Sequence, residues 1–169
     1  MSWGKLFKDV SKALKVSNGG KSKKNTGTIA RIEASHRSEI VILESLEIIE
    51  NSTNWGTKKS RIAVVIKTAE LLSKTSIFPT TREKMKNALP QYKAQQIEIH
   101  IDALKTKVNS DVSKAHKLKS NDAKLRALSK VHEYIYQVQN NDQFVPYEII
   151  EHMKNMVDMG IERLKQTNS

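Results

Sequence analysis

The sequence predicts an all-α fold, and three observations lead to that prediction. Apolar residues recur every three or four positions over most of residues 29–166, which is the period of a helix with one buried face. Clusters of turn-forming residues interrupt this pattern at only a few places, and the stretches between them are longer than ordinary strands. No internal repeat and no sustained alternation typical of a β-sheet is evident. We expect an antiparallel bundle of four to five helices.

The first sixteen residues form the most distinctive stretch of the chain. Placed on a helix at ~100° per residue, they gather their apolar side chains within an arc of roughly 120° and their lysines opposite. The apolar set is Trp3, Leu6, Phe7, Val10 and Leu14, with Ala13 among them. The basic set is Lys5, Lys8, Lys12 and Lys15. The pattern predicts a basic amphipathic helix over residues 1–16.

Three interpretations of this N-terminal segment stay open. It can lie in an anionic membrane interface, fill a groove of a partner protein or pack back on its own domain. On a helix, the fourteen residues from Trp3 to Val16 would be about 21 Å long, which is too short to span a bilayer, and the segment is too charged. It also lacks the apolar core and cleavage site of a secretory signal. We expect a cytoplasmic protein that attaches to a membrane surface or a partner through the apolar and basic residues named above.

Residues 17–28 predict a flexible linker, because glycines, lysines and small polar residues alternate there. Thr28 suits a helix N-cap, so the bundle domain is expected over residues 29–169. A first helix should run from there to Asn51, where turn formers over residues 51–56 end it. The next helix, about 57–74, is apolar on nearly all sides, so we expect it to be the most buried one.

Pro90 is expected to separate a short helix over residues 82–88 from a long one that runs to about Lys119. Apolar positions alternate by three and four along residues 94–118, which is a heptad pattern. These positions are Ala94, Ile97, Ile101, Leu104, Val108, Ala115 and Leu118. Packing inside the bundle is the favoured interpretation, and pairing with another chain to form an oligomer through residues 94–118 is the alternative.

Two further helices complete the bundle. The first follows the capping sequence Ser120-Asn121-Asp122, and the second follows Pro146, which suits a first helical turn. The last helix contains three methionines spaced three apart: Met153, Met156 and Met159. Methionines at this spacing are typical of a core, although they also occur in adaptable binding grooves.

The chain carries a net charge of +11, and residues 1–28 hold seven lysines against one aspartate. This balance favours anionic partners such as lipids, nucleic acids or acidic proteins. A charge-driven nucleic-acid-binding protein is therefore the alternative function. Its candidate contacts are Lys21, Lys23, Lys24, Arg82, Lys84 and Lys86. Lysines far outnumber arginines, which favours loose electrostatic contact over base readout.

Few residues suggest catalysis or a cofactor. The chain has no cysteine, so it has no disulfide, thiol nucleophile or cysteine-bound metal. Glu33 and His36 have the spacing of a di-iron ligand pair, but no second copy exists, so we expect His36 to be a packed histidine. Gly20-Lys21-Ser22 lacks the spacing of a phosphate-binding loop. We expect no metal and no cofactor.

The sequence thus favours a non-enzymatic helical interaction module, whose N-terminal basic amphipathic helix docks on an anionic membrane surface or in a partner groove. The less favoured third hypothesis is a helical-bundle enzyme. It would need two histidines or acidic groups that converge in a pocket, drawn from the five histidines of the chain.

Overall fold

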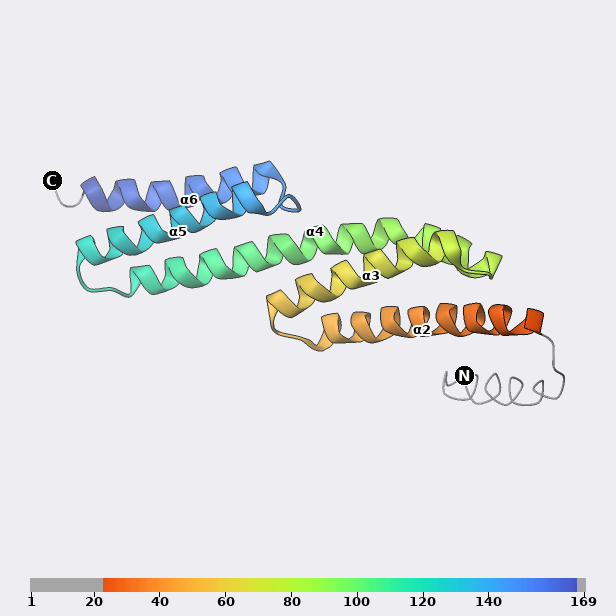
Figure 1. Cartoon of the computed structure of the whole chain (residues 1–169). Coiled ribbons are helices and arrows are strands. Elements are labelled where there is room, and N and C mark those ends of the chain that lie inside the picture. Colours follow the sequence, from red (N-terminus) through yellow and green to blue (C-terminus); the bar gives the residue numbers. More distant parts are fainter. Residues whose placement is uncertain (1–22, 167–169) are drawn as a thin grey trace.

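The structure is a computed structural model that describes residues 23–166, with side chains from residue 27 onward. Within these residues it contains five α-helices and no strand, which confirms the all-α prediction (Figure 1). They are α2 (Lys23–Asn51), α3 (Trp55–Thr75), α4 (Pro79–His116), α5 (Asn121–Asn141) and α6 (Tyr147–Gln166). None of these helices is long and apolar enough to cross a membrane.

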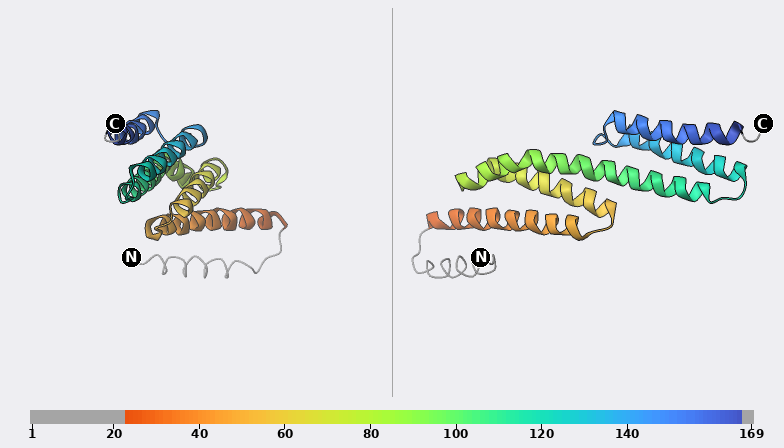
Figure 2. Two further views of the ribbon diagram at one scale, coloured as in Figure 1. Left: turned by 90° about the vertical axis from the view of Figure 1, so that its left-hand side faces the viewer. Right: turned by 180° about the vertical axis from the view of Figure 1, so that it is seen from behind.

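Consecutive helices run antiparallel, as expected for a bundle, but the arrangement is elongated. Figures 1 and 2 show the helices offset from one another along the long axis of the molecule, with α4 extending from one half to the other. Its first half packs on α3, which packs on α2, and its second half packs on α5 and α6. The helix 57–74 is predicted to be the central, most buried one. Its counterpart α3 has a larger share of buried residues than α4, five of 21 against seven of 38, but α4 is the more central helix because it contacts three others.

Two hydrophobic cores follow from this arrangement. The N-terminal core lies between α2, α3 and the first half of α4, and Ile62 and Val65 are fully buried at its centre. The C-terminal core lies between the second half of α4, α5 and α6, around the fully buried Val108 and Ile135. The central heptad positions of α4 belong to this second core, as packing inside the bundle requires: Leu104, Val108 and Ala115.

The helix boundaries differ from the expected ones at two places. α2 begins at Lys23, so Thr28 is not an N-cap and the last six residues of the expected linker are helical. α4 continues through Pro90, where a break was predicted. A proline inside a helix costs about 3 kcal/mol. Pro90 is exposed, so solvent can satisfy the unpaired carbonyl, and burial of Met85 and Ile99 holds the helix on both sides of it.

Two helix starts carry side-chain caps. The Asn54 side chain accepts a hydrogen bond from the Thr57 N–H at 3.0 Å at the start of α3. Ser120 Oγ accepts one from the Ala123 N–H at 3.2 Å at the start of α5, which confirms the predicted capping sequence. These caps satisfy backbone donors that a helix leaves unpaired and so define where each helix begins.

Candidate functional site

The residues predicted to contact a membrane or a partner lie outside the described part of the chain. These are Trp3, Leu6, Phe7, Val10, Leu14, Lys5, Lys8, Lys12 and Lys15. Lys21 of the nucleic-acid alternative also lies outside it, and Lys23 and Lys24 are described only as backbone in the first turn of α2.

The start of α2 lies at the same end of the molecule as the connection between α3 and α4 (Figure 1). Thr81 Oγ1 donates a hydrogen bond to Glu39 Oε1 at 3.0 Å, and the His36 and Phe78 rings lie 6.0 Å apart. His36 is half-buried, as expected for a packed histidine. We call this region, residues 23–39 and 74–86, the basic end, because it holds eight lysines and arginines against three glutamates.

The basic side chains of this end do not form one patch. Arg82 is half-buried, and its Nη1 donates a hydrogen bond to the Ser76 carbonyl at 3.0 Å, so it anchors the loop after α3. Lys84 and Lys86 are exposed, but residues two apart lie on opposite sides of a helix. The predicted nucleic-acid contacts on α4 thus gather at one end without converging on one face.

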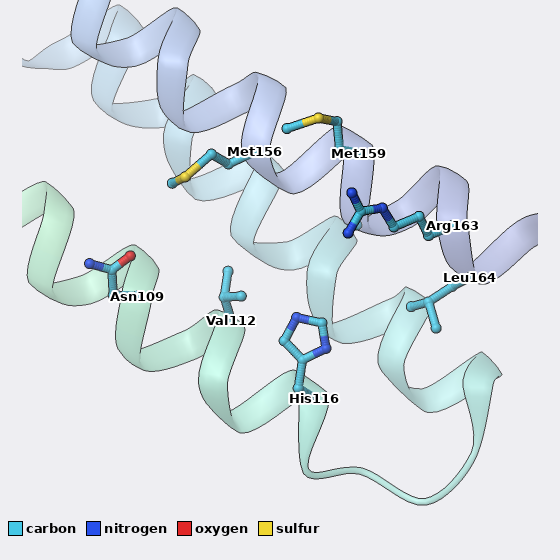
Figure 3. Close-up of a pocket in the computed structure, with 8 residues that line it drawn as sticks. Asn109, Val112, His116, Met156, Met159, Arg163 and Leu164 are labelled. Atoms are coloured by element: carbon cyan, nitrogen blue, oxygen red, sulfur yellow. The ribbon is translucent and has the colours of Figure 1, made fainter.

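A groove opens between the second half of α4 and α6, with a volume of about 360 Å³. Figure 3 shows Met156, Met159 and Arg163 extending from α6 toward the same side, opposite Val112 and His116 of α4. Met156 and Met159 are 37% and 52% exposed, whereas Met153 one turn away is buried. The core interpretation therefore holds for Met153, whereas Met156 and Met159 line a surface groove.

The lining of the groove is suited to apolar contact. Its described lining is mainly apolar, and the ionisable groups in it are His116 and Arg163 at one end, with no acidic side chain. Methionine side chains are flexible and polarizable, so such a surface adapts to an apolar partner.

A charged cluster joins the two halves of the molecule where the loop after α5 meets α3 and α4. The Asp142 carboxylate contacts His100 Nδ1 through both oxygens, at 2.8 and 2.7 Å. It also accepts hydrogen bonds from Lys59 Nζ at 2.9 Å and from the Phe144 N–H at 3.2 Å. The Phe144 ring lies 4.8 Å from the imidazole ring of His100. We call these four residues the junction cluster.

Electrostatics at the junction cluster favour the ionised carboxylate. Burial raises the pKa of Asp142, but the hydrogen bonds from His100 and Lys59 outweigh that effect, so the pKa lies below its ordinary value. The partners of Asp142 are an imidazole, an ammonium group and a backbone N–H, and an aromatic ring covers the imidazole. This is the environment of a structural ion pair, because none of these groups is a hydroxyl or thiol that His100 could activate.

The five histidines lie in separate surroundings. His36 packs near Phe78, and His116 lines the groove. His132 Nε2 lies 3.3 Å from Asp158 Oδ1, His100 belongs to the junction cluster, and His152 is exposed on α6. Among residues 23–166, no three histidine or acidic side chains come together in a way that could hold a metal ion. Within this range a histidine lies against a carboxylate at two places, the His100–Asp142 and the His132–Asp158 pairs.

Sequence reasoning missed the junction cluster, since Asp142 and His100 are 42 residues apart and neither belongs to a motif. Comparison of the chain with protein-family models, with curated proteins and with solved structures found no match.

Proposed function

We propose that the protein is a non-enzymatic helical interaction module, which attaches through its N-terminal basic amphipathic segment to an anionic membrane surface. The observation that carries the proposal is the segregation of residues 3–16 into an apolar and a lysine-rich side. In this function Trp3, Phe7 and the neighbouring apolar side chains enter the interface, and the lysines face lipid phosphates.

The basic end of the folded body supports this assignment. The segment precedes Lys23, so chain connectivity joins it to the end of the body at which basic residues outnumber acidic ones. Lys84 and Lys86 are exposed there and can add attraction to an anionic surface. Each lysine near an anionic leaflet contributes about 1 kcal/mol, and partly buried aromatic and aliphatic side chains add a few more. The sum suits reversible attachment.

Vesicle binding tests the proposal. Full-length protein carrying Trp55→Phe reports on Trp3 alone, and its fluorescence and far-UV circular dichroism are recorded with anionic vesicles, neutral vesicles and duplex DNA in turn. We expect a blue shift and added helicity with anionic vesicles only. Phe7→Asp should abolish cosedimentation with these vesicles, whereas Leu71→Asp, at an exposed position of α3, should leave it unchanged.

Three other outcomes of these experiments would support a different mode of attachment. A Trp3 emission that is already blue-shifted and stays constant would mean that the segment packs on its own body. Binding that survives both Phe7→Asp and deletion of residues 2–16 would refute the amphipathic segment as the attachment site. A response that appears only with a protein partner would point to a partner groove in place of a membrane.

A second candidate function is electrostatic binding of nucleic acid at the basic end. It is favoured by the position of Lys84 and Lys86 at the end where α2 starts with Lys23 and Lys24. Affinity for duplex DNA should then fall steeply with salt, because released counterions drive such binding. Trp3→Ala should leave it unchanged, while Lys84→Glu together with Lys86→Glu should weaken it.

A further inference from the structure

α4 joins two ends of the molecule that are both rich in basic residues. It begins at the basic end, and its 38 residues reach about 57 Å to the turn before α5. Figures 1 and 2 show the connections on either side of α4 at opposite ends of the molecule. We call the second connection, residues 114–126, the α4–α5 corner. It holds five lysines and arginines against one aspartate, so both ends of the folded body attract anions.

The apex of the α4–α5 corner is a leucine between two lysines. Leu118 is 40% exposed, and Lys117 and Lys119 on either side of it are exposed. Leu118 continues the heptad pattern, but α4 ends at His116, so Leu118 lies beyond the residues that pack in the C-terminal core. Its N–H donates a hydrogen bond to the Ala115 carbonyl at 3.2 Å, which holds its backbone directly after the helix. The turn therefore presents an apolar side chain to solvent with a cation on each side.

The lysines of the corner are available to an outside anion. Among the described residues, no ion pair or hydrogen bond engages the side chains of Lys117, Lys119 or Lys124. Lys114, in contrast, contacts Asp111 at 3.3 Å. Three lysines near one exposed leucine can thus contact phosphate groups without first breaking a contact within the protein.

A leucine among lysines favours a lipid surface over a nucleic acid. Lysine ammonium groups attract the phosphates of both. An exposed leucine strengthens binding where it can enter an apolar phase, as at the interface of a bilayer, whereas a nucleic-acid backbone offers no such phase. The side chains of Lys117 and Lys119 are long enough to keep their ammonium groups among lipid headgroups while Leu118 enters the acyl boundary.

The region between the two basic ends opposes binding along the side of the molecule. Residues 131–158, from the middle of α5 to the middle of α6, hold five acidic residues against one lysine. Figure 1 shows the connection between these helices in the middle of the molecule, away from both basic ends. An anionic bilayer would repel this region if the molecule lay flat on it. Contact through the ends is therefore favoured.

We propose that the α4–α5 corner is a second membrane-binding surface, through which the protein bridges two anionic membranes. This inference rests on the proposed function, because the N-terminal segment provides the first attachment. That segment is connected to α2, which begins at the basic end, so the chain joins it to the end of the body opposite the corner. A single corner binds weakly. Proteins held on one membrane present many corners to a second membrane, and their combined contacts suffice for bridging.

Vesicle clustering tests the inference. Two populations of phosphatidylserine–phosphatidylcholine vesicles, one with donor and one with acceptor lipids, are mixed with full-length protein. We expect energy transfer and increased light scattering with wild type, and neither with neutral vesicles. Leu118→Asp and Lys117→Glu/Lys119→Glu should each raise the protein concentration needed for clustering at least about tenfold, because each removes apolar or cationic contact from the corner. Both variants should still cosediment with anionic vesicles, since the N-terminal segment is intact.

Two controls match these variants. Leu71→Asp replaces a leucine that is 55% exposed on α3, and Arg61→Glu/Lys67→Glu reverses two exposed cations of the same helix. Both should cluster vesicles as wild type does. Phe7→Asp should abolish cosedimentation and clustering together, because it removes the first attachment. Circular dichroism establishes that each variant is folded.

The outcomes separate the two attachments. Wild type that cosediments without clustering would overturn the bridging inference and leave the N-terminal attachment in place, whereas wild type that does neither would overturn both. Clustering that persists in both corner variants would show that another surface makes the second contact. A corner that binds nucleic acid instead would give clustering unaffected by Leu118→Asp, together with duplex DNA binding that Lys117→Glu/Lys119→Glu weakens, and this result would also overturn the inference.

Discussion

Asp142 at the end of α5 binds His100 in the middle of α4 through both carboxylate oxygens, at 2.7 and 2.8 Å. The same carboxylate accepts a hydrogen bond from Lys59 of α3 at 2.9 Å. The contact therefore joins the loop after α5, which belongs to the C-terminal half, to helices of both halves. Within the described chain, α4 also connects the two halves, because its residues belong to both cores.

Asp142→Asn should lower the free energy of unfolding by about 1–3 kcal/mol at pH 7, because His100 and Lys59 would lose the charge that pairs with them. Urea unfolding followed by far-UV circular dichroism measures the loss. Asp122→Asn is the matched control. Asp122 lies in the first turn of α5 outside the junction cluster, so its effect should be a few tenths of a kcal/mol.

The same contact predicts how stability depends on pH. The pKa of Asp142 is lowered in the folded protein, so the carboxylate stabilises the fold above its ordinary value of 3.8 and that contribution is lost as the pH falls through the lower, folded-state pKa. The difference in unfolding free energy between wild type and Asp142→Asn should therefore shrink below about pH 4. A difference that stays constant down to pH 2 would contradict the role assigned to the ion pair.

The two cores should respond separately to large-to-small substitutions. Ile62→Ala and Ile135→Ala each remove a fully buried side chain, one in each core, and each should cost about 2–5 kcal/mol. In hydrogen exchange, Ile62→Ala should reduce amide protection more in α2 and α3, and Ile135→Ala should reduce it more in α5 and α6. Leu71→Ala, at a position that is 55% exposed, should change stability by less than about 0.5 kcal/mol. Equal loss of protection in both halves for either variant would mean that the molecule unfolds as one unit.

The sequence pattern predicted the helices well because helical periodicity is local. Spacings of four and seven among Leu104, Val108 and Ala115 identified buried positions of α4, although Ala94 and Ile97 of the same pattern are exposed. Ser120 identified the start of α5. The helix break predicted at Pro90 is wrong because what holds the helix together there is not local. The local cost of proline is visible in the sequence, but the burial of the helix on both sides of it, which offsets that cost, depends on which helices become neighbours.

The candidate sites were less predictable than the fold. Nothing local links His100 to Asp142, since their contact depends on how two helices cross. The spacing of the three methionines predicted that they lie close together on the last helix. Which of them faces the core depends on the position of α5 and on how little α6 contacts α4. The nine residues of the N-terminal amphipathic pattern remain a prediction, since they lie outside the described range.

Pro90→Ala should stabilise the protein by about 1–3 kcal/mol. Alanine restores a backbone donor inside α4 and relieves the clash of the proline ring with the preceding turn, while the greater freedom of the unfolded chain offsets about 0.4–1 kcal/mol of that gain. Thermal unfolding followed by circular dichroism measures the shift in midpoint. Ala88→Gly, two residues earlier in the same helix, should act in the opposite direction by about 1 kcal/mol. A Pro90→Ala variant less stable than wild type would imply that α4 needs a bend at this point.

Methionine oxidation should distinguish the two sides of α6. Met156 and Met159 are 37% and 52% exposed, whereas Met153 and Met85 are 5% and 3% exposed. Dilute hydrogen peroxide should therefore convert the first two to sulfoxides before the buried pair, as peptide mass spectrometry can measure. Oxidation of Met153 as fast as that of Met156 and Met159 would contradict the assignment of Met153 to the core.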